Sequence, residues 1–465
     1  MYTLAHMQSF LLKLIVFTAV SLIINCKNPP PTGVIDETPS EIALAQDINF
    51  ASPNASSKEL RWEYLSIHQL YKSYFIWSDS IKSASDYEDL ADLYINGINA
   101  IDKYSGYIPP FASEEVWEGF EKPQKVGGRI GILFEEIENT SDTIPDTLQL
   151  AFVYRDSPAD SLGWQRGDQI LAIQAIDSSS LFPLTGIESP LASFNDLSQG
   201  FSGDTLYIQL YRADSLWVDT LVKAPITEPT VLHYNINDSI SYIQVKSFRT
   251  TNEDFSQWQT SNEFLYALAE TQGVQNAIID LRDNPGGSVI ECARMADFFL
   301  QKGQIIFKTQ SKPLSSVDNK TIYSTIAASD TLPTQNRNYV FLANKNSASC
   351  AEIFLNAIAF NTDWPIVGTT TFGKGIGQSF YTTYLRGIAK LTTLLFYNDD
   401  DETFHLKGVP PTHKVEEENA QYAKALSLLG LQQTNRTLPR AFLKSPTETQ
   451  AQEQQAVLLY PDSTF

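Results

Sequence analysis

The sequence predicts an α/β core that follows a helical region and a small β-rich unit, and three patterns lead to this prediction. From about residue 229 onward, expected strands at 241–245, 277–281 and 339–343 alternate with expected helices at 254–269 and 289–300, which is typical of an α/β fold. Between residues 127 and 224, short alternating strands are separated by turns that contain glycine. Between residues 59 and 121, apolar residues recur at intervals of three and four, as on one face of a helix, and a second helix in this region is expected through Leu90 to Ile98.

These patterns divide the chain of 465 residues into several segments, and its length is sufficient for more than one buried core. We expect a lipoprotein-type signal peptide at 1–26, a flexible linker at 27–57, an N-terminal helical region at 58–124, a β domain at 125–225, the α/β core at 226–432 and a polar tail at 433–465.

The first residues have the composition of an export signal. An apolar run from residue 10 to 24 has Lys13 near its start and is followed closely by Cys26. A cysteine in this place resembles the lipidation site of bacterial lipoproteins, so we expect a lipid-anchored, exported protein on the periplasmic face of a membrane or in the cell envelope. A membrane anchor that is never cleaved is the alternative. No later stretch reaches the ~20 apolar residues that a membrane span needs.

Charge and cysteine content exclude several classes of protein. The net charge of -21 argues against nucleic acid or an anionic lipid surface as the main partner. After Cys26 only Cys292 and Cys350 remain, and these do not make a disulfide framework or a zinc-binding spacing. We therefore expect both to be small buried residues, and we expect no metal site. The acidic run at 399–402 is interpreted as a solvated turn rather than a calcium site.

The β-rich segment has the order and spacing of a PDZ domain. Its signatures are a Ser157-Pro158-Ala159 turn and the stretch Gly167-Asp168-Gln169-Ile170, followed by further strands. A PDZ domain binds the end of a peptide by adding it as a strand to an open sheet edge. A β domain that acts only as a spacer is the alternative interpretation.

The PDZ resemblance also implies which residues contact the peptide. In such domains the loop before the binding strand offers backbone amides to the terminal carboxylate, and Arg129, Ile130 and Gly131 occupy that loop here. Ile132 and Phe134 follow and are expected to shape the pocket for an apolar last side chain.

Two side chains in the core are placed for acyl transfer. Ser349 precedes an apolar helical run, so the free N–H groups and the positive end of the helix dipole point at its hydroxyl. Lys374 lies between two glycines after a short strand-like segment, where the backbone can bend sharply. A hydroxyl and an amine brought together in this way form a Ser–Lys dyad. Taken alone, Ser349 would be a helix N-cap and Lys374 a surface lysine.

A glycine turn supplies a third element of this chemistry. Gly286 and Gly287 follow a buried strand, and glycines leave backbone amides open to a ligand. Two such N–H groups aimed at one point form an oxyanion hole.

Together these stretches resemble the carboxy-terminal processing, or tail-specific, serine peptidases, which have a PDZ domain before a crotonase/ClpP-like α/β core. The matching positions follow the order of that family over roughly residues 60 to 430: Ile101 to Tyr107, Gly131-Ile132, Asp280-Leu281-Arg282, Asn284, Gly286-Gly287, Ser347 to Ser349, Glu352, Thr371 to Gly375, Gln378, Lys390 to Thr393, Gly408-Val409 and Pro411. Ser349 and Lys374 are separated by 25 residues, the spacing that the family uses between its nucleophile and base.

The resemblance implies a role for each residue of the site. Ser349 is the nucleophile, and Lys374 is the general base once burial lowers its pKa from ~10.4. Gln378 helps to hold the lysine. The oxyanion donors are the amide of Cys350 and that of Gly286 or Gly287. No cofactor is implied, and the substrates are proteins or peptides with accessible C-termini.

The chain departs from the family pattern at three places. The acidic residue that often follows the nucleophile helix is replaced in the stretch Ala359-Phe360-Asn361, Lys345-Asn346 precedes Ser347 in place of the commoner glycine, and Pro411-Thr412 stands where Pro-Asp is common. The first and third lie outside the dyad and bear on substrate choice and efficiency rather than on reaction class.

Other functions stay open at this point. The main alternative is a catalytically inactive PDZ-containing adaptor on the same fold. A third possible function is acyl transfer or hydration on the same fold, but the sequence contains no coenzyme-binding motif. His68, His233, His405 and His413 show no recognisable Ser-His-Asp spacing, although such triads are defined in space rather than in sequence.

Overall fold

The computed structural model describes residues 55–123, 125–135, 148–174, 179–187, 189–312, 322–329 and 337–431. The expected signal peptide with Cys26, most of the linker and the tail at 433–465 lie outside these residues. Among the helices of the described ranges, none combines the length and the apolar character that crossing a bilayer requires.

A six-stranded sheet forms the centre of the core. Its strand order is β10 (Val231–Asn237), β11 (Ile240–Val245), β12 (Asn276–Asp280), β15 (Asn338–Ala343), β16 (Ile366–Gly368) and β19 (His413–Lys414). Only β10 and β11 pair antiparallel, and the other neighbours are parallel. The strands β11, β12 and β15 are apolar almost throughout because both faces of this sheet are covered.

Helices cover the two faces of this sheet unequally. The helices α9 (Thr260–Glu270), α10 (Val289–Asp297) and α11 (Cys350–Asn361) pack on one face, around Phe264, Phe299 and Phe354. The helix α12 (Glu418–Leu428) packs on the other face through Tyr422 and Leu426. The predicted strands at 241–245, 277–281 and 339–343 and the predicted helix after residue 289 are confirmed to within three residues at each end.

Two predicted helices differ from the structure. The segment expected to be helical from 254 to 269 is broken into a 3-10 helix (Glu253–Trp258) and α9, because Arg249 Nε donates to the carbonyl of Trp258 and the Thr260 hydroxyl donates to that of Ser247. The helix expected through Leu90 to Ile98 is a short α5 (Leu90–Asp92) that continues as a wider π-helix (Leu93–Ile98).

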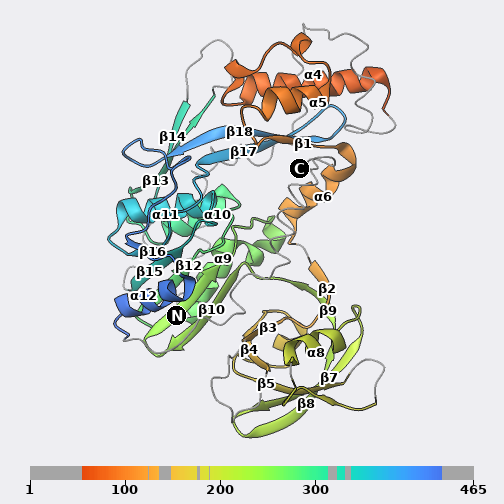
Figure 1. Ribbon diagram of the computed structural model, residues 1–465, viewed down its shortest axis with the longest axis vertical. Helices are drawn as coiled ribbons and strands as arrows, with labels where there is room; N and C mark the ends of the chain where they lie inside the picture. The colour runs from red at the N-terminus through yellow and green to blue at the C-terminus, as the bar shows by residue number, and fades with distance from the viewer. Residues whose placement is uncertain are drawn as a thin grey trace.

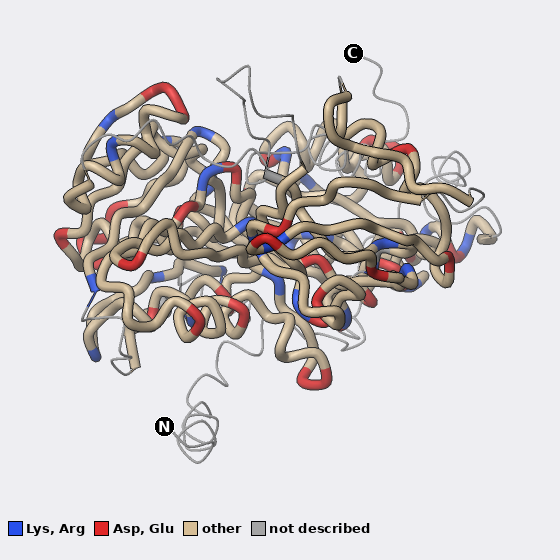
Figure 2. Tube along the Cα trace, turned by 90° about the horizontal axis from the view of Figure 1, so that it is seen from below, with Lys and Arg blue, Asp and Glu red and all other residues tan. Residues whose placement is uncertain are grey.

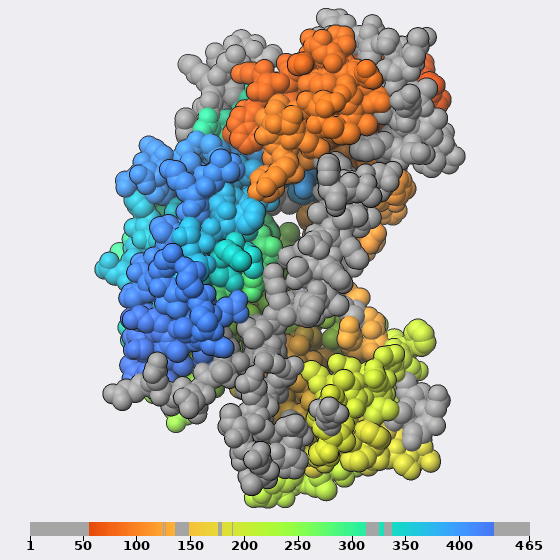
Figure 3. Space-filling view, viewed as in Figure 1, coloured from red at the N-terminus to blue at the C-terminus, as the bar shows by residue number. Residues whose placement is uncertain are grey.

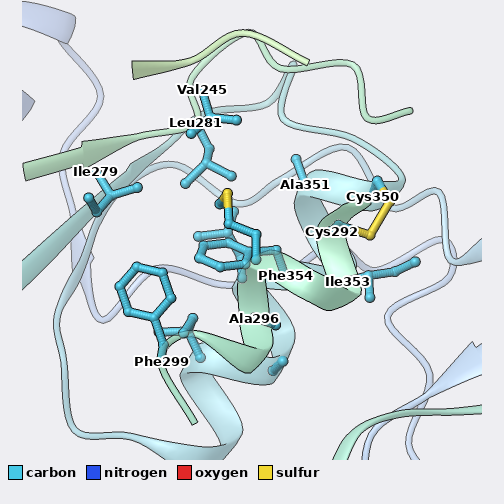
Figure 4. Close-up of a cluster of buried hydrophobic side chains, with 14 of the residues drawn as sticks. Val245, Ile279, Leu281, Cys292, Ala296, Phe299, Cys350, Ala351, Ile353 and Phe354 are labelled. Atoms are coloured by element: carbon cyan, nitrogen blue, oxygen red, sulfur yellow. A yellow bond between two sulfur atoms is a disulfide. The ribbon is translucent and has the colours of Figure 1, made fainter. Parts of the chain in front are cut away.

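Cys292 and Cys350 form a disulfide, which corrects our expectation of two free buried thiols. Both residues are fully buried, as expected, and their Cα atoms lie 5.8 Å apart. The bond joins α10 to the first residue of α11, beside the apolar side chains of Ile353 and Phe354 (Figure 4). The sequence separation of 58 residues gives no sign of this proximity, which arises because the two helices pack side by side on one face of the sheet.

A second sheet connects the core to the N-terminal helical residues. It contains β1 (Gly106–Ile108), β18 (Ile388–Tyr397), β13 (Ile305–Ser311) and β14 (Ile322–Ala327), and β17 (Ile376–Thr382) pairs with β18. The helix α4 (Ser57–Tyr74) and the segment from 81 to 98 share a hydrophobic cluster with Ala389 and Leu391 of β18. The carboxylate of Glu63 reinforces this contact, since it accepts from Tyr107 and Thr383 hydroxyls and from the Leu385 amide.

Residues 125–227 form a separate antiparallel β unit. Its main sheet has the order β3 (Ile132–Glu135), β4 (Leu148–Val153), β5 (Gln169–Gln174), β7 (Thr205–Arg212) and β8 (Ser215–Val222), with β6 (Phe182–Pro183) paired to β5. A two-stranded ribbon, β2 (Lys125–Arg129) and β9 (Ala224–Thr227), joins the unit to the rest of the chain. The helices α7 (Pro158–Ser161) and α8 (Pro190–Leu197) complete it.

The three parts follow one another along the long axis of the molecule. The N-terminal helices lie at one end, the β unit at the other and the core between them, while α6 (Pro110–Glu121) connects the helical end to the β unit (Figure 1). The same order is visible on the molecular surface (Figure 3). Acidic residues are spread along the described trace rather than gathered in one segment (Figure 2).

Candidate active site

Ser349 is the N-cap of α11 and has an unusual backbone conformation. Its φ of 56° and ψ of -115° lie outside the regions that a serine ordinarily adopts. Strain of this kind persists only where the surroundings hold the residue in place, and it often marks a functional site. The following amides of α11 open toward the Ser349 side chain, as expected from the sequence.

The carboxylate of Glu352 holds the serine and lysine segments together. It accepts the backbone N–H groups of Ser349 at 2.8 Å, Lys374 at 2.7 Å and Gly373 at 2.5 Å, and the hydroxyl of Thr371 at 2.6 Å. Its exposed fraction is 0%, and burial raises its pKa while these four donors lower it. A single buried carboxylate therefore fixes the backbones of both members of the predicted dyad.

Lys374 lies in an environment that lowers its pKa. Burial and, second, the nearby Lys390 lower the pKa of Lys374 to about 8, against the opposing charges of Asp102 and Glu352. Its Nζ atom lies 5.0 Å from the ring centroid of Tyr104, which belongs to the N-terminal helical region. Within the described chain the amine and the Ser349 hydroxyl make no hydrogen bond to each other, so proton transfer requires the amine to move toward the serine.

Gln378 does not hydrogen-bond to Lys374 in this structure. Its Nε2 atom donates instead to the Thr392 hydroxyl on the paired strand β18, at 3.1 Å. The Thr392 hydroxyl in turn donates to Asp102 Oδ2 at 2.6 Å. The sequence indicated that Asp102, Glu352 and Thr392 match the family pattern, but nothing in the pattern pointed to these contacts.

The glycine turn lies directly against the nucleophile. A Cβ atom on Gly286 would come within 2.7 Å of Ser349 Cβ and 2.8 Å of the Cys350 nitrogen, so only glycine fits at this position. The Gly286 N–H already donates to Asn284 Oδ1 at 2.8 Å, which argues against Gly286 as an oxyanion donor. The amides of Gly287 and Cys350 have no acceptor among the described residues. The geometry thus favours Gly287 over Gly286 as the partner of Cys350.

The histidines do not supply an alternative base. None of the four in the described ranges, His68, His233, His405 and His413, hydrogen-bonds to Ser349. Only His405 lies near the lysine, because its backbone packs against Gly375. The other serine of the motif, Ser347, is buried and donates its hydroxyl to the Leu281 carbonyl at 2.8 Å.

The predicted peptide-binding loop lies at the edge of the β unit. The carbonyl oxygens of Ile130 and Gly131 accept from Ala159 and Tyr154, whereas the amides of the same two residues have no acceptor within the described chain. Gly131 has a φ of 84°, and a Cβ atom there would lie 2.1 Å from Ser157 Cβ, so a side chain is excluded. Arg129 ends β2 immediately before this loop.

The strand that follows this loop has one unpaired edge. β3 contains Ile132 and Phe134 and is the first strand of its sheet, paired only with β4 in the described chain. The ring of Phe134 meets that of Phe194 on α8 with centroids 4.8 Å apart. Ile130 of the loop, Ile132 and Phe134 of the edge strand and Phe194 of the helix belong to one hydrophobic cluster.

Comparison with known proteins relates the α/β core to a peptidase family. The model of peptidase family S41 matches residues 239–415, which contain the glycine turn, Ser349, Lys374 and Gln378. This part of the chain is similar to family S41, and the protein is accordingly a serine-type peptidase.

Several curated proteins that are named carboxy-terminal processing or CtpA-like proteases are similar to the chain. The carboxy-terminal processing protease CtpA of Bacillus subtilis is 27% identical over 77% of this chain and 70% of its own length. A probable CtpA-like serine protease of Staphylococcus haemolyticus is 27% identical over 56% of this chain and 48% of its own length. The carboxy-terminal-processing protease of Bartonella bacilliformis is 24% identical over 81% and 80%. Among solved structures, a photosystem II D1 C-terminal processing protease aligns with a TM-score of 0.44 and 16% identity, over 78% of this chain and 95% of that chain.

Proposed function

We propose that this peptidase hydrolyses peptide bonds through an acyl-enzyme formed on Ser349. Neutral Lys374 takes the proton of the Ser349 hydroxyl as the serine oxygen attacks the scissile carbonyl. The amides of Gly287 and Cys350 stabilise the negative oxygen of the tetrahedral intermediate. The protonated lysine then gives its proton to the leaving amine, and a water molecule hydrolyses the ester by the same steps.

The observation that carries this proposal is the position of Glu352. Its carboxylate binds the backbone of the serine and that of the lysine, while the pKa of Lys374 is lowered to about 8. At neutral pH a useful fraction of the amine is therefore unprotonated, on a segment that shares the Glu352 carboxylate with the nucleophile. A binding protein that only used the fold as a scaffold would have no physical need for this combination.

Substitution of the dyad tests the proposed mechanism. Ser349→Ala and Lys374→Ala should each abolish cleavage of an unfolded protein substrate, measured by the appearance of new carboxyl ends. Lys302→Ala, an exposed lysine in the loop after α10, is the matched control and should cleave normally. Cleavage by Ser349→Ala would refute the mechanism, and an inactive wild-type protein that still binds peptides would favour the adaptor function.

We further propose that the β unit is a PDZ domain that binds the C-terminus of the substrate. Support comes from the amides of Ile130 and Gly131 and the edge of β3, all unpaired among the described residues, and from the apolar position formed by Phe134 and Phe194. A peptide with an apolar last residue should bind more tightly with a free carboxylate than with a C-terminal amide. Phe134→Ala should weaken the binding of the carboxylate form, and equal affinity for both peptides would contradict the assignment.

We also propose that the protein acts outside the cytoplasm, on protein substrates, as a lipid-anchored enzyme. The disulfide between Cys292 and Cys350 supports an oxidising compartment, in which such bonds form and persist. Cys26→Ser should release the protein from the membrane fraction if this cysteine carries the lipid anchor. Unchanged membrane association of that variant would contradict lipidation.

A further inference from the structure

Three residues from distant parts of the chain form a hydrogen-bonded relay next to the catalytic lysine. Gln378 Nε2 on β17 lies 3.1 Å from Thr392 Oγ1 on β18, and Thr392 Oγ1 lies 2.6 Å from Asp102 Oδ2. Ser105 Oγ also donates to Asp102 Oδ2 at 2.6 Å, and the Tyr104 amide donates to Oδ1 at 3.0 Å. Thr392 has an exposed fraction of 0%, and Asp102 of 5%, so water does not compete for these bonds.

The direction of each hydrogen bond in this relay follows from the carboxylate. An ionised carboxylate only accepts hydrogen bonds, so the Thr392 hydroxyl must use its single hydrogen toward Asp102. The Thr392 oxygen can then only accept from Gln378. The amide of Gln378 must therefore turn its NH₂ group toward Thr392, which leaves its Oε1 oxygen, an acceptor, on the opposite side.

We propose that Asp102 and Thr392 are positioning residues that fix the orientation of the Gln378 amide, so that its oxygen is the atom that accepts an N–H of Lys374 when the amine moves toward Ser349. The inference rests on the proposed Ser–Lys mechanism. In that mechanism the amine must present its lone pair, rather than an N–H, to the serine hydroxyl. A fixed acceptor on one side of the amine achieves this by binding one of its N–H groups. In the reversed orientation Gln378 would offer N–H donors to the amine and occupy the lone pair.

The relay also gives the N-terminal helical region a part in the active site. Asp102 follows the π-helix of that region, and Tyr104, two residues later, covers the lysine amine. The Thr392 backbone amide donates to Ser105 Oγ at 2.9 Å, so the loop from 102 to 105 is bound to β18 at more than one point. The orientation of a residue in the core thus depends on a loop 290 residues away in sequence from Thr392.

Substitutions at Thr392 test the inference, and the same two strands offer a matched control. Thr392→Val removes the hydroxyl at nearly constant shape and should lower kcat about tenfold with little change in KM, since one hydrogen bond is lost. Thr392→Ser keeps the hydroxyl and should restore most of kcat. The control is Thr393→Val, because the Thr393 hydroxyl bonds to Ser379 at 2.6 Å between the same strands on the opposite face. It should leave kcat unchanged.

A double-mutant cycle separates positioning of Gln378 from general loss of packing. If Thr392 acts through Gln378, Thr392→Val should lower kcat no further in a Gln378→Ala background. Additive losses, an unchanged kcat in Thr392→Val, or an equal loss in Thr393→Val would each overturn the inference. The proposed mechanism fails by a different result, namely cleavage by Ser349→Ala or Lys374→Ala, so the two failures are distinguishable.

Discussion

The pKa of Lys374 is set by burial and by charges on three other segments, namely Lys390 on β18, Asp102 in the N-terminal region and Glu352 on α11. The positive charge of Lys390 lowers its pKa, whereas Asp102 and Glu352 raise it, and burial adds the largest lowering effect. The sequence predicted that this lysine must be buried to act as a base. It could not predict the role of Lys390, whose effect depends on the pairing of β17 with β18.

Lys390→Met should move the pH dependence of catalysis to higher pH. Removal of the neighbouring positive charge lets the pKa of Lys374 rise from about 8 toward the ordinary lysine value, so less of the amine is neutral at pH 7. The rising limb of kcat/KM against pH, which follows deprotonation of Lys374, should move upward. If the pKa of Lys374 rises by one, activity at neutral pH should fall about tenfold, because the neutral fraction of the amine falls by that factor.

Two further variants test the direction in which the pH dependence of catalysis shifts. Asp102→Asn removes a charge that raises the pKa of Lys374, so its rising limb should move to lower pH even though its plateau is reduced. Lys302→Met removes an exposed charge in the loop after α10 and should leave the limb in place. If the rising limb of kcat/KM in Lys390→Met stays at the same pH or moves to lower pH, the assignment of Lys374 as the base is contradicted.

The disulfide links the two helices that frame the active site. The bond closes a loop of 58 residues between α10 and α11, and Cys350 is also a proposed oxyanion donor. By the chain-entropy model, closure of a loop of this size stabilises the folded core by about 4 kcal/mol. Cys292→Ala should therefore lower the unfolding midpoint of the core markedly, as measured by thermal or denaturant unfolding.

The reductant provides the control for the disulfide prediction. Unfolding of the wild-type protein in the presence of a thiol reductant should approach that of Cys292→Ala, because the reduced chain has lost the same crosslink. The variant itself should be insensitive to the reductant. A wild-type midpoint that does not change on reduction would show that the crosslink contributes little to stability.

The sequence predicted correctly the elements whose positions follow from a local pattern of residues. It failed for features that depend on the packing of distant segments. The strands at 240–245, 276–280 and 338–343 are continuous apolar runs, and their positions were predicted correctly. Three features depend on contacts between distant segments: the disulfide of Cys292 with Cys350, the break before α9, and the hydrogen bonds that Glu352 accepts from the serine and lysine segments. The spacing of 25 residues between Ser349 and Lys374 indicated the dyad only through the family resemblance.

The β unit and the core share one hydrophobic cluster. Ala151 and Tyr154 of the β unit pack with Leu232 and Tyr234 of β10, on the sheet face that also carries α12. Arg155 lies over the rings of Trp258 and Tyr266 in the core, with its guanidinium carbon 5.1 Å and 5.0 Å from their centroids. The sequence predicted two units but not that they pack together in this way.

His233 lies within this contact and makes it sensitive to acid. Its ring is 5.7 Å from that of Phe152 in the β unit and 5.8 Å from that of Tyr266 in the core, and its Nδ1 atom is buried without a partner in the described chain. Burial, and second the charge of Arg155, lower the pKa of His233 to about 4. The docked arrangement therefore requires a neutral ring.

Acid should weaken the docking of the β unit against the core. When the contact opens and His233 regains solvent, its pKa returns toward about 6.5, so the open form binds more protons. Docking stability is then fully present above about pH 6.5 and declines as the pH falls toward 4, by up to about 3 kcal/mol. Hydrogen exchange of the β10 amides and the distance between probes on the two units should both report opening over this range.

Two variants serve as controls for the role of His233. His233→Phe keeps an apolar ring between Phe152 and Tyr266 but does not titrate, so its docking should be independent of pH over this range. His413→Gln should behave as the wild-type protein. If His233→Phe opened over the same pH range as the wild-type protein, some other group would control the contact between the two units.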